Sequence, residues 1–141
     1  MARRASPRKT RSKRPVMPGL GSQKIVAFAA TRDPGRAKAF YQGVLGLRLV
    51  SEDSFALVFR VGGTMLRVTT VQEMAVAPYT VLGWHVTSIA ATMTTLERAA
   101  VVFERYPGMP QDKRGVWTAP GGARIAWFKD PDGNTLSITQ F

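Results

Sequence analysis

The chain has 141 residues, a formal net charge of +11 and no cysteine. This length is sufficient for one domain with a hydrophobic core, and the lack of cysteine excludes disulfides, thiolate nucleophiles and cysteine metal sites. No apolar run approaches the roughly 18 residues that a membrane-spanning helix needs, so we expect no membrane span. No apolar segment of the signal-peptide kind follows the basic start, and we therefore expect a cytoplasmic protein.

The positive charge is concentrated at the start of the chain. Residues 1–16 contain seven Lys or Arg and no acidic residue, which leaves a net charge of +4 for the rest. We expect residues 1–22 to form a disordered tail, because Pro and Gly recur there and like charges repel. The tail is an arm that contacts nucleic acid or an anionic membrane surface, or a solvated extension, or the result of a start codon placed too early, with Met17 as the real beginning. The absence of interleaved aromatic residues disfavours base stacking.

The segment after the tail predicts one strand, one helix and three further strands. The first strand covers residues 25–31, and Asp33 is placed to cap a helix that has Pro34 in its first turn and ends at Gly46. Strands are predicted over residues 47–51, 55–61 and 64–71, with Gly62 and Gly63 as the hairpin turn between the last two.

The same order of elements recurs in the second half of the chain. A strand over residues 80–87 precedes a helix that Ser88 can cap and that extends to about residue 99. Strands are then expected over residues 101–106, 115–118 and 123–129, and a closing strand ends the chain. The sequence thus predicts a tail (1–22) and an α+β domain (23–141), which is divided into module one (23–72), a linker (73–79) and module two (80–141). We expect two βαβββ modules that pair into a curved mixed sheet around a trough.

Three short segments carry a family pattern: DPGRAKAFY at 33–41, VLGL at 44–47 and DPDGN at 130–134. Their order resembles the vicinal oxygen chelate superfamily, which contains glyoxalases, bleomycin resistance proteins and extradiol dioxygenases. The resemblance implies the glyoxalase/bleomycin-resistance fold, a small-molecule ligand and a homodimer. It leaves the reaction open, because this superfamily includes isomerases, lyases, dioxygenases and binding proteins. We assign Asp130 and Asp132 to the last hairpin turn and not to a paired-carboxylate site.

Metal-using members of this superfamily take His or Gln, Glu, His and Glu ligands from the first and last strands of each module. At the corresponding positions this chain has Val26, Arg67, Val81 and Ser137. Valine has no ligating atom, arginine stays cationic, and a lone serine is a poor ligand for a divalent ion. We therefore expect neither a metal site of the superfamily type nor a cofactor.

Arg67 is the most informative of these substitutions. A buried guanidinium needs an anionic partner, so Arg67 either clamps a ligand carboxylate or phosphate or pairs internally with an acid such as Asp53 or Glu73. If the strand is shifted, Arg67 is solvated instead. Strand alternation places further side chains on the face toward the trough, and the residues that we expect to contact the ligand are Phe28, Met65, Arg67, His85, Trp117 and Ser137.

His85 is the only histidine in the chain. It shares a strand face with Val81, whereas Trp84 points to the opposite side and is expected in the core. His85 is either a general base or ligand contact, or a structural histidine satisfied by a neighbour. The sequence therefore predicts a metal-free protein that binds a small organic ligand, with Arg67 favouring an anionic one. The alternative is a glyoxalase- or dioxygenase-type isomerase or lyase, with His85 as its base or with metal ligands elsewhere in the chain.

Overall fold

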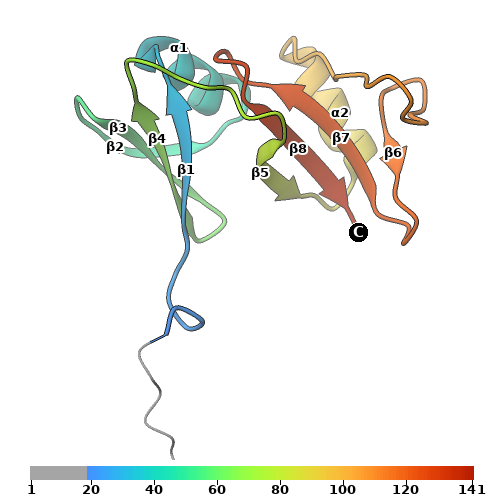
Figure 1. Ribbon diagram of the computed structural model, residues 1–141, viewed down its shortest axis with the longest axis horizontal. Helices are drawn as coiled ribbons and strands as arrows, with labels where there is room; N and C mark the ends of the chain where they lie inside the picture. The colour runs from blue at the N-terminus through green and yellow to red at the C-terminus, as the bar shows by residue number, and fades with distance from the viewer. Residues whose placement is uncertain (1–18) are drawn as a thin grey trace, which may run out of the picture.

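The computed structural model describes residues 19–141, which form two modules that each contain one four-stranded sheet (Figure 1). Most of the predicted tail, residues 1–18, lies outside the described residues. The elements of the first module are β1 (Val26–Thr31), α1 (Pro34–Lys38), η1 (Ala39–Val44), β2 (Arg48–Glu52), β3 (Ala56–Val61) and β4 (Thr64–Thr70). Those of the second are β5 (Thr80–His85), α2 (Ile89–Arg98), β6 (Trp117–Thr118), β7 (Arg124–Lys129) and β8 (Thr135–Gln140).

Both helices begin at the residues that the sequence indicated. The Asp33 carboxylate accepts a hydrogen bond from the Arg36 backbone N–H, and the Ser88 hydroxyl accepts one from the Ala91 N–H. Each bond satisfies a donor that the first turn of a helix leaves without an intrahelical partner. The helix that begins at Pro34 continues as η1, a π-helical turn that buries Phe40 and Tyr41.

Each sheet pairs its first strand with its last. The N-terminal sheet has the order β1-β4-β3-β2 and the C-terminal sheet the order β5-β8-β7-β6, and β1–β4 and β5–β8 are the parallel pairs. The predicted hairpin between β3 and β4 is confirmed, because Gly62 and Gly63 have φ angles of 52° and 83°, which this tight turn requires of both central residues.

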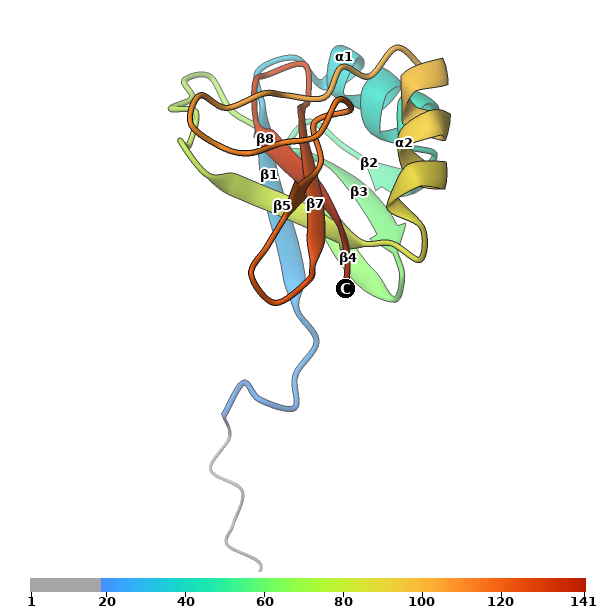
Figure 2. The same ribbon diagram turned by 90° about the vertical axis from the view of Figure 1, so that its right-hand side faces the viewer.

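One face of each sheet is covered by a helix, and we call the other the open face. On the N-terminal sheet the covered face includes Leu57, Phe59, Leu66 and Val68, all at most 2% exposed. The N-terminal open face carries Val26, Phe28, Val58, Arg60, Met65 and Arg67. In the other module α2 packs against β7 and β8 (Figures 1 and 2), and the C-terminal open face carries Gly83, His85, Ile125, Trp127, Ser137 and Thr139.

Two strands of the second module are not formed as predicted. In residues 101–106 only Phe103 makes a bridge, to Phe128, and the strand expected over residues 115–118 is reduced to the two residues of β6. The Gln111 side chain explains this difference. It accepts a hydrogen bond from the Tyr106 N–H and donates to the carbonyls of Glu104 and Gly115, so it satisfies backbone groups that a neighbouring strand would otherwise satisfy.

The hydrophobic core is continuous across the two modules. The ring of Phe40 lies 6.5 Å from that of Phe128, and the indole of Trp84 stacks on Phe128 at the same centroid distance. The prediction that Trp84 points to the core side is therefore confirmed. In residues 19–141, no helix combines the length and the apolar composition that membrane crossing requires.

The turn before β8 joins the modules through polar contacts, which we call the junction network (Tyr41, Asp130 and Asn134). The Tyr41 hydroxyl donates to Asp130 Oδ2 at 2.7 Å, and the Asn134 side-chain amide donates to the same oxygen at 2.7 Å and to the Ala30 carbonyl at 2.9 Å. Asp130 Oδ1 accepts the backbone N–H groups of Asp132 and Asn134. Asp130 and Asp132 are thus turn residues, as the sequence indicated.

Candidate functional site

Three of the predicted ligand contacts lie together on the N-terminal open face. Arg67 on β4 is the register partner of Phe28 on β1 and of Val58 on β3, and Met65 occupies the same face two residues earlier on β4. Phe28 is 60% exposed. An exposed phenyl ring next to a guanidinium can hold the apolar and the charged parts of one ligand.

Arg67 is half-buried and has no ion-pair partner in the described part of the chain, where the two ion pairs are Lys38–Glu52 and Arg114–Glu97. The nearby Asp53 is already engaged, because its Oδ1 accepts the backbone N–H groups of Phe55 and Ala56 at 2.8 and 3.0 Å. These two bonds lower the pKa of Asp53, with a smaller contribution from the charge of Arg67. Arg67 is thus close enough to influence this carboxylate without forming an ion pair with it.

The other three predicted contacts lie on the C-terminal open face. Ser137 on β8 is the register partner of Gly83 on β5 and of Trp127 on β7, while the row of His85 leads across β8 and β7 to Trp117. The six predicted residues therefore form two groups on two different sheets. The rings of Trp117 and Trp127 lie 6.2 Å apart, which gives the second group an aromatic wall.

His85 is exposed, and its ring meets that of the C-terminal residue Phe141 edge-on at 5.0 Å. Among the side-chain hydrogen bonds of residues 19–141, none orients its imidazole. A general base is usually held in position by a third group, and His85 has no such group among the residues that the structure describes. Its surroundings therefore fit a residue that contacts a ligand at the edge of the sheet better than they fit a general base.

Gly83 and Ser137 are in unusually close contact. A Cβ atom at position 83 would lie 2.6 Å from Ser137 Oγ, which is well inside van der Waals distance. The hydroxyl of Ser137 therefore occupies the space that a side chain at position 83 would need.

The substitution Gly83→Ala is expected to lower the free energy of unfolding by about 1 kcal/mol, because the Ser137 hydroxyl must rotate away. The double variant Gly83→Ala/Ser137→Ala should be no less stable than Ser137→Ala alone. Urea unfolding of the three variants completes a double-mutant cycle. A coupling energy near zero would show that the two side chains do not compete for this space.

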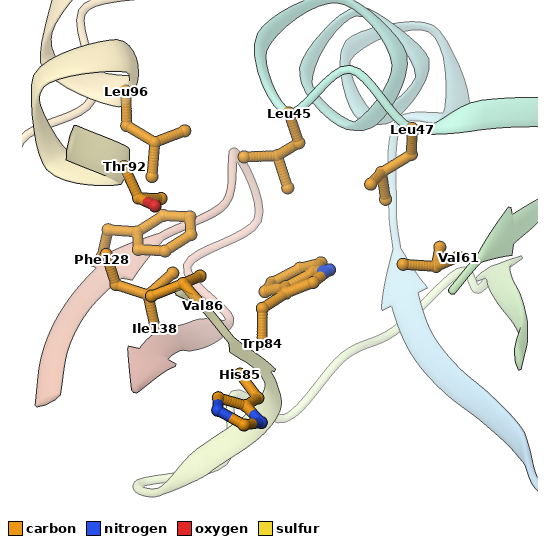
Figure 3. Close-up of a pocket in the computed structure, with 10 residues that line it drawn as sticks. All are labelled: Leu45, Leu47, Val61, Trp84, His85, Val86, Thr92, Leu96, Phe128 and Ile138. Carbon is orange, nitrogen blue, oxygen red and sulfur yellow. The ribbon is translucent and has the colours of Figure 1, made fainter. Parts of the chain in front are cut away.

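A pocket at the junction of the two modules was not predicted. It has a volume of about 240 Å³ and is lined by Leu45, Leu47, Val61, Trp84, His85, Val86, Thr92, Leu96, Phe128 and Ile138. Figure 3 shows the Trp84 indole in the middle of the pocket and the His85 imidazole pointing away from it. A neighbouring hollow of about 480 Å³ shares Val61, Trp84 and His85 with it. The sequence pattern predicts the strands and helices within each module, but it does not predict how one module packs on the other. The pocket forms only through that packing.

The linker forms one wall of a third hollow. This hollow has a volume of about 310 Å³, and the residues that line it include Phe28, Thr69 and Val81 as well as Met74 and Ala75 of the linker. Phe28 can thus contact a ligand that rests on the open face or one that enters this hollow.

The four strand positions that hold metal ligands in relatives do not fit a divalent ion here. Val26 and Val81 provide no donor atom, Arg67 is a cation, and Ser137 is a single hydroxyl on the other sheet. Within residues 19–141, no three His, Asp or Glu side chains are grouped so that they could hold a metal ion. The donor set of these strands therefore matches an organic ligand better than a hard or borderline cation.

Comparison with known proteins agrees with this architecture. Residues 24–138 match the family model described as Glyoxalase/Bleomycin resistance protein/Dioxygenase superfamily. No match is found among curated proteins.

Solved structures with the same fold include a lactoylglutathione lyase from Agrobacterium tumefaciens, with 20% identity, a TM-score of 0.66 and coverage of 85% of this chain and 95% of that one. They also include the fosfomycin resistance protein FosX from Listeria monocytogenes, with 14% identity, a TM-score of 0.64 and coverage of 85% and 93%. Identities at this level establish the fold alone. Because the family model covers most of its length, the chain belongs to the glyoxalase/bleomycin resistance protein/dioxygenase superfamily.

Proposed function

We propose that this protein binds a small organic anion on the N-terminal open face, without a metal ion. The observation that carries the proposal is the position of Arg67, a half-buried arginine that has no ion pair in residues 19–141 and stands beside the 60% exposed ring of Phe28. A guanidinium in partly dehydrated surroundings gains most from a carboxylate or phosphate that it can bind through two parallel hydrogen bonds.

The contacts beside Arg67 fit the remainder of such a ligand. Phe28 offers an aromatic face, and Met65 offers an unbranched side chain that adapts to different shapes. Both residues share the open face with Arg67. We infer that the ligand has a planar or apolar body and at least one acidic group. The homodimer and the cytoplasmic location remain predictions from the sequence.

The enzymatic alternative has one observation in its favour. His85 lines both the junction pocket and the neighbouring hollow of about 480 Å³, so a ligand there could reach its imidazole. Binding without conversion is favoured because no described hydrogen bond orients that ring. Recovery of a bound compound unchanged after long incubation supports binding, and a product that disappears in His85→Ala would support the alternative.

The substitution Arg67→Gln is expected to weaken the binding of benzoate about 10- to 100-fold, which corresponds to the roughly 1.5–3 kcal/mol of a hydrogen-bonded charged group. Benzamide, which has the same ring without the charge, should bind the wild type and the variant equally weakly. The measurement is an NMR titration of labelled protein, in which β1 and β4 should carry the largest shift changes.

The matched control is Arg98→Gln, which removes an exposed arginine from the end of α2 and keeps the N-terminal open face intact. It should leave benzoate affinity within about twofold, since long-range effects are screened by salt. Equal affinities of the wild type and Arg67→Gln for benzoate would refute the proposal, as would shift changes confined to the C-terminal sheet.

A further inference from the structure

Two further arginines share the N-terminal open face with Arg67. Arg48 on β2 and Arg60 on β3 are direct cross-strand partners, and Arg60 is in turn the partner of Met65. Arg60 thus lies diagonally from Arg67, which is two residues further along β4. Diagonal neighbours of this kind are about 7–8 Å apart, within reach of long side chains. Three guanidinium groups therefore face the same side of one sheet.

These three charges are not neutralised by the described residues. Glu52, at the end of β2, pairs instead with Lys38 at 2.8 Å. Asp53, the next residue, accepts two backbone N–H groups and forms no ion pair. Residues 1–18 cannot supply a side-chain carboxylate either, because that segment contains no Asp or Glu.

Like charges that stand directly opposite each other in a sheet are unfavourable, by up to about 1 kcal/mol per pair. The pair formed by Arg48 and Arg60 has this arrangement, and both residues are exposed. An anion with two or more negative charges would convert this repulsion into attraction, and arginine clusters are the usual partners of phosphate groups.

The order of the strands arranges these residues along an oblique path across the sheet. From β1 to β2, Phe28 and Arg67 lie in one cross-strand row, and Arg60 and Arg48 lie in the row two residues away, which also holds Met65. Neighbouring strands are about 4.8 Å apart and the two rows about 7 Å apart, so the path from Phe28 to Arg48 spans roughly 16 Å. A ligand that follows it has a ring at one end, one acidic group at Arg67 and a second acidic group at the arginine pair.

We propose that the N-terminal open face binds a planar ring followed by two phosphate groups, the chemistry of a nucleoside diphosphate. This proposal rests on the proposed function, because it assigns the first acidic group to Arg67. It adds that the Arg48–Arg60 pair recognises the second group and so selects diphosphates over monophosphates.

Adenosine, AMP and ADP form a probe series in which each member adds one phosphate to the same ring. With EDTA and 150 mM KCl present, calorimetry on the wild type should show AMP binding about 10-fold more tightly than adenosine, and ADP about 10-fold more tightly than AMP. The double variant Arg48→Gln/Arg60→Gln should bring the ADP-to-AMP affinity ratio to about one and leave AMP affinity nearly unchanged. The control Arg98→Gln should keep both ratios.

The outcomes separate the two proposals. If AMP binds through Arg67 but ADP binds no better, or if the double variant keeps the preference for ADP, the diphosphate assignment is wrong while anion binding stands. If Arg67→Gln leaves the affinities for benzoate and AMP unchanged, the proposed function itself is wrong. A circular dichroism spectrum like that of the wild type confirms that each variant is folded.

Discussion

Replacing Asp130 by alanine is expected to lower the free energy of unfolding by about 3–5 kcal/mol, the range seen when a buried charged hydrogen-bonding group is removed. The carboxylate is 5% exposed and accepts four hydrogen bonds, from the Tyr41 hydroxyl, the Asn134 amide and the backbone N–H groups of Asp132 and Asn134. Without it, the Tyr41 hydroxyl and the two backbone N–H groups lose their acceptor in a region that water does not easily reach, and the Asn134 amide keeps only the Ala30 carbonyl.

The matched control is Asp132→Ala in the same turn. Asp132 accepts one hydrogen bond, from the backbone N–H of Arg32, at an exposed site, so its loss should cost about 1 kcal/mol or less. Urea unfolding followed by tryptophan fluorescence measures both variants. If the losses in the free energy of unfolding differ by less than about 0.5 kcal/mol, which is the scatter usual for such comparisons, the junction network does not stabilise the fold.

Alkaline pH is expected to destabilise the wild type in a way that depends on Tyr41. Burial, followed by the neighbouring Asp130 charge and the hydrogen bond to it, raises the pKa of the Tyr41 hydroxyl far above its usual value of 10. Both folded and unfolded chains keep this proton below about pH 10. Above that pH the unfolded chain releases it first, so the free energy of unfolding falls with a slope of up to about 1.4 kcal/mol per pH unit.

The variant Tyr41→Phe has no such proton. The stability difference between the wild type and Tyr41→Phe should therefore shrink by about 1 kcal/mol between pH 9.5 and pH 11. Tyr106→Phe is the control, because burial also raises the pKa of Tyr106 although this residue lies outside the junction network. It therefore separates the effect of burying a tyrosine from the effect of the network. A difference between the wild type and Tyr41→Phe that stays constant over this range would mean that Tyr41 ionises equally in the folded and unfolded chains.

Local sequence signals predict most of this fold because they act over a few residues. Asp33 and Ser88 cap helices through bonds to residues three positions later, and the Gly62–Gly63 turn depends on its own backbone angles. The strand expected over residues 101–106 is absent because Gln111 satisfies the backbone there. The sequence around Gln111 gives no signal of this role, because glutamine has no fixed position in loops of this kind.

Strand alternation also predicts the composition of each open face, because the side-chain period in a strand is fixed. Arg67 and Phe28, which it assigns to the same side of their sheet, are register partners. It does not determine how one sheet lies relative to the other, because that depends on contacts such as Phe40 with Phe128, which are distant in sequence. For the same reason the junction pocket around Trp84 could not be predicted.

The contact from Asn134 to the Ala30 carbonyl joins positions 104 residues apart, and that from Tyr41 to Asp130 joins positions 89 apart. During synthesis, the first half of the chain is therefore complete long before the residues that bind it have been made. Contacts with such large sequence separation form late and slow the folding of small domains. A ribosome that stalls before residue 130 would thus hold a first half whose Tyr41 hydroxyl still lacks its acceptor, and we expect that intermediate to be a preferred substrate for chaperones.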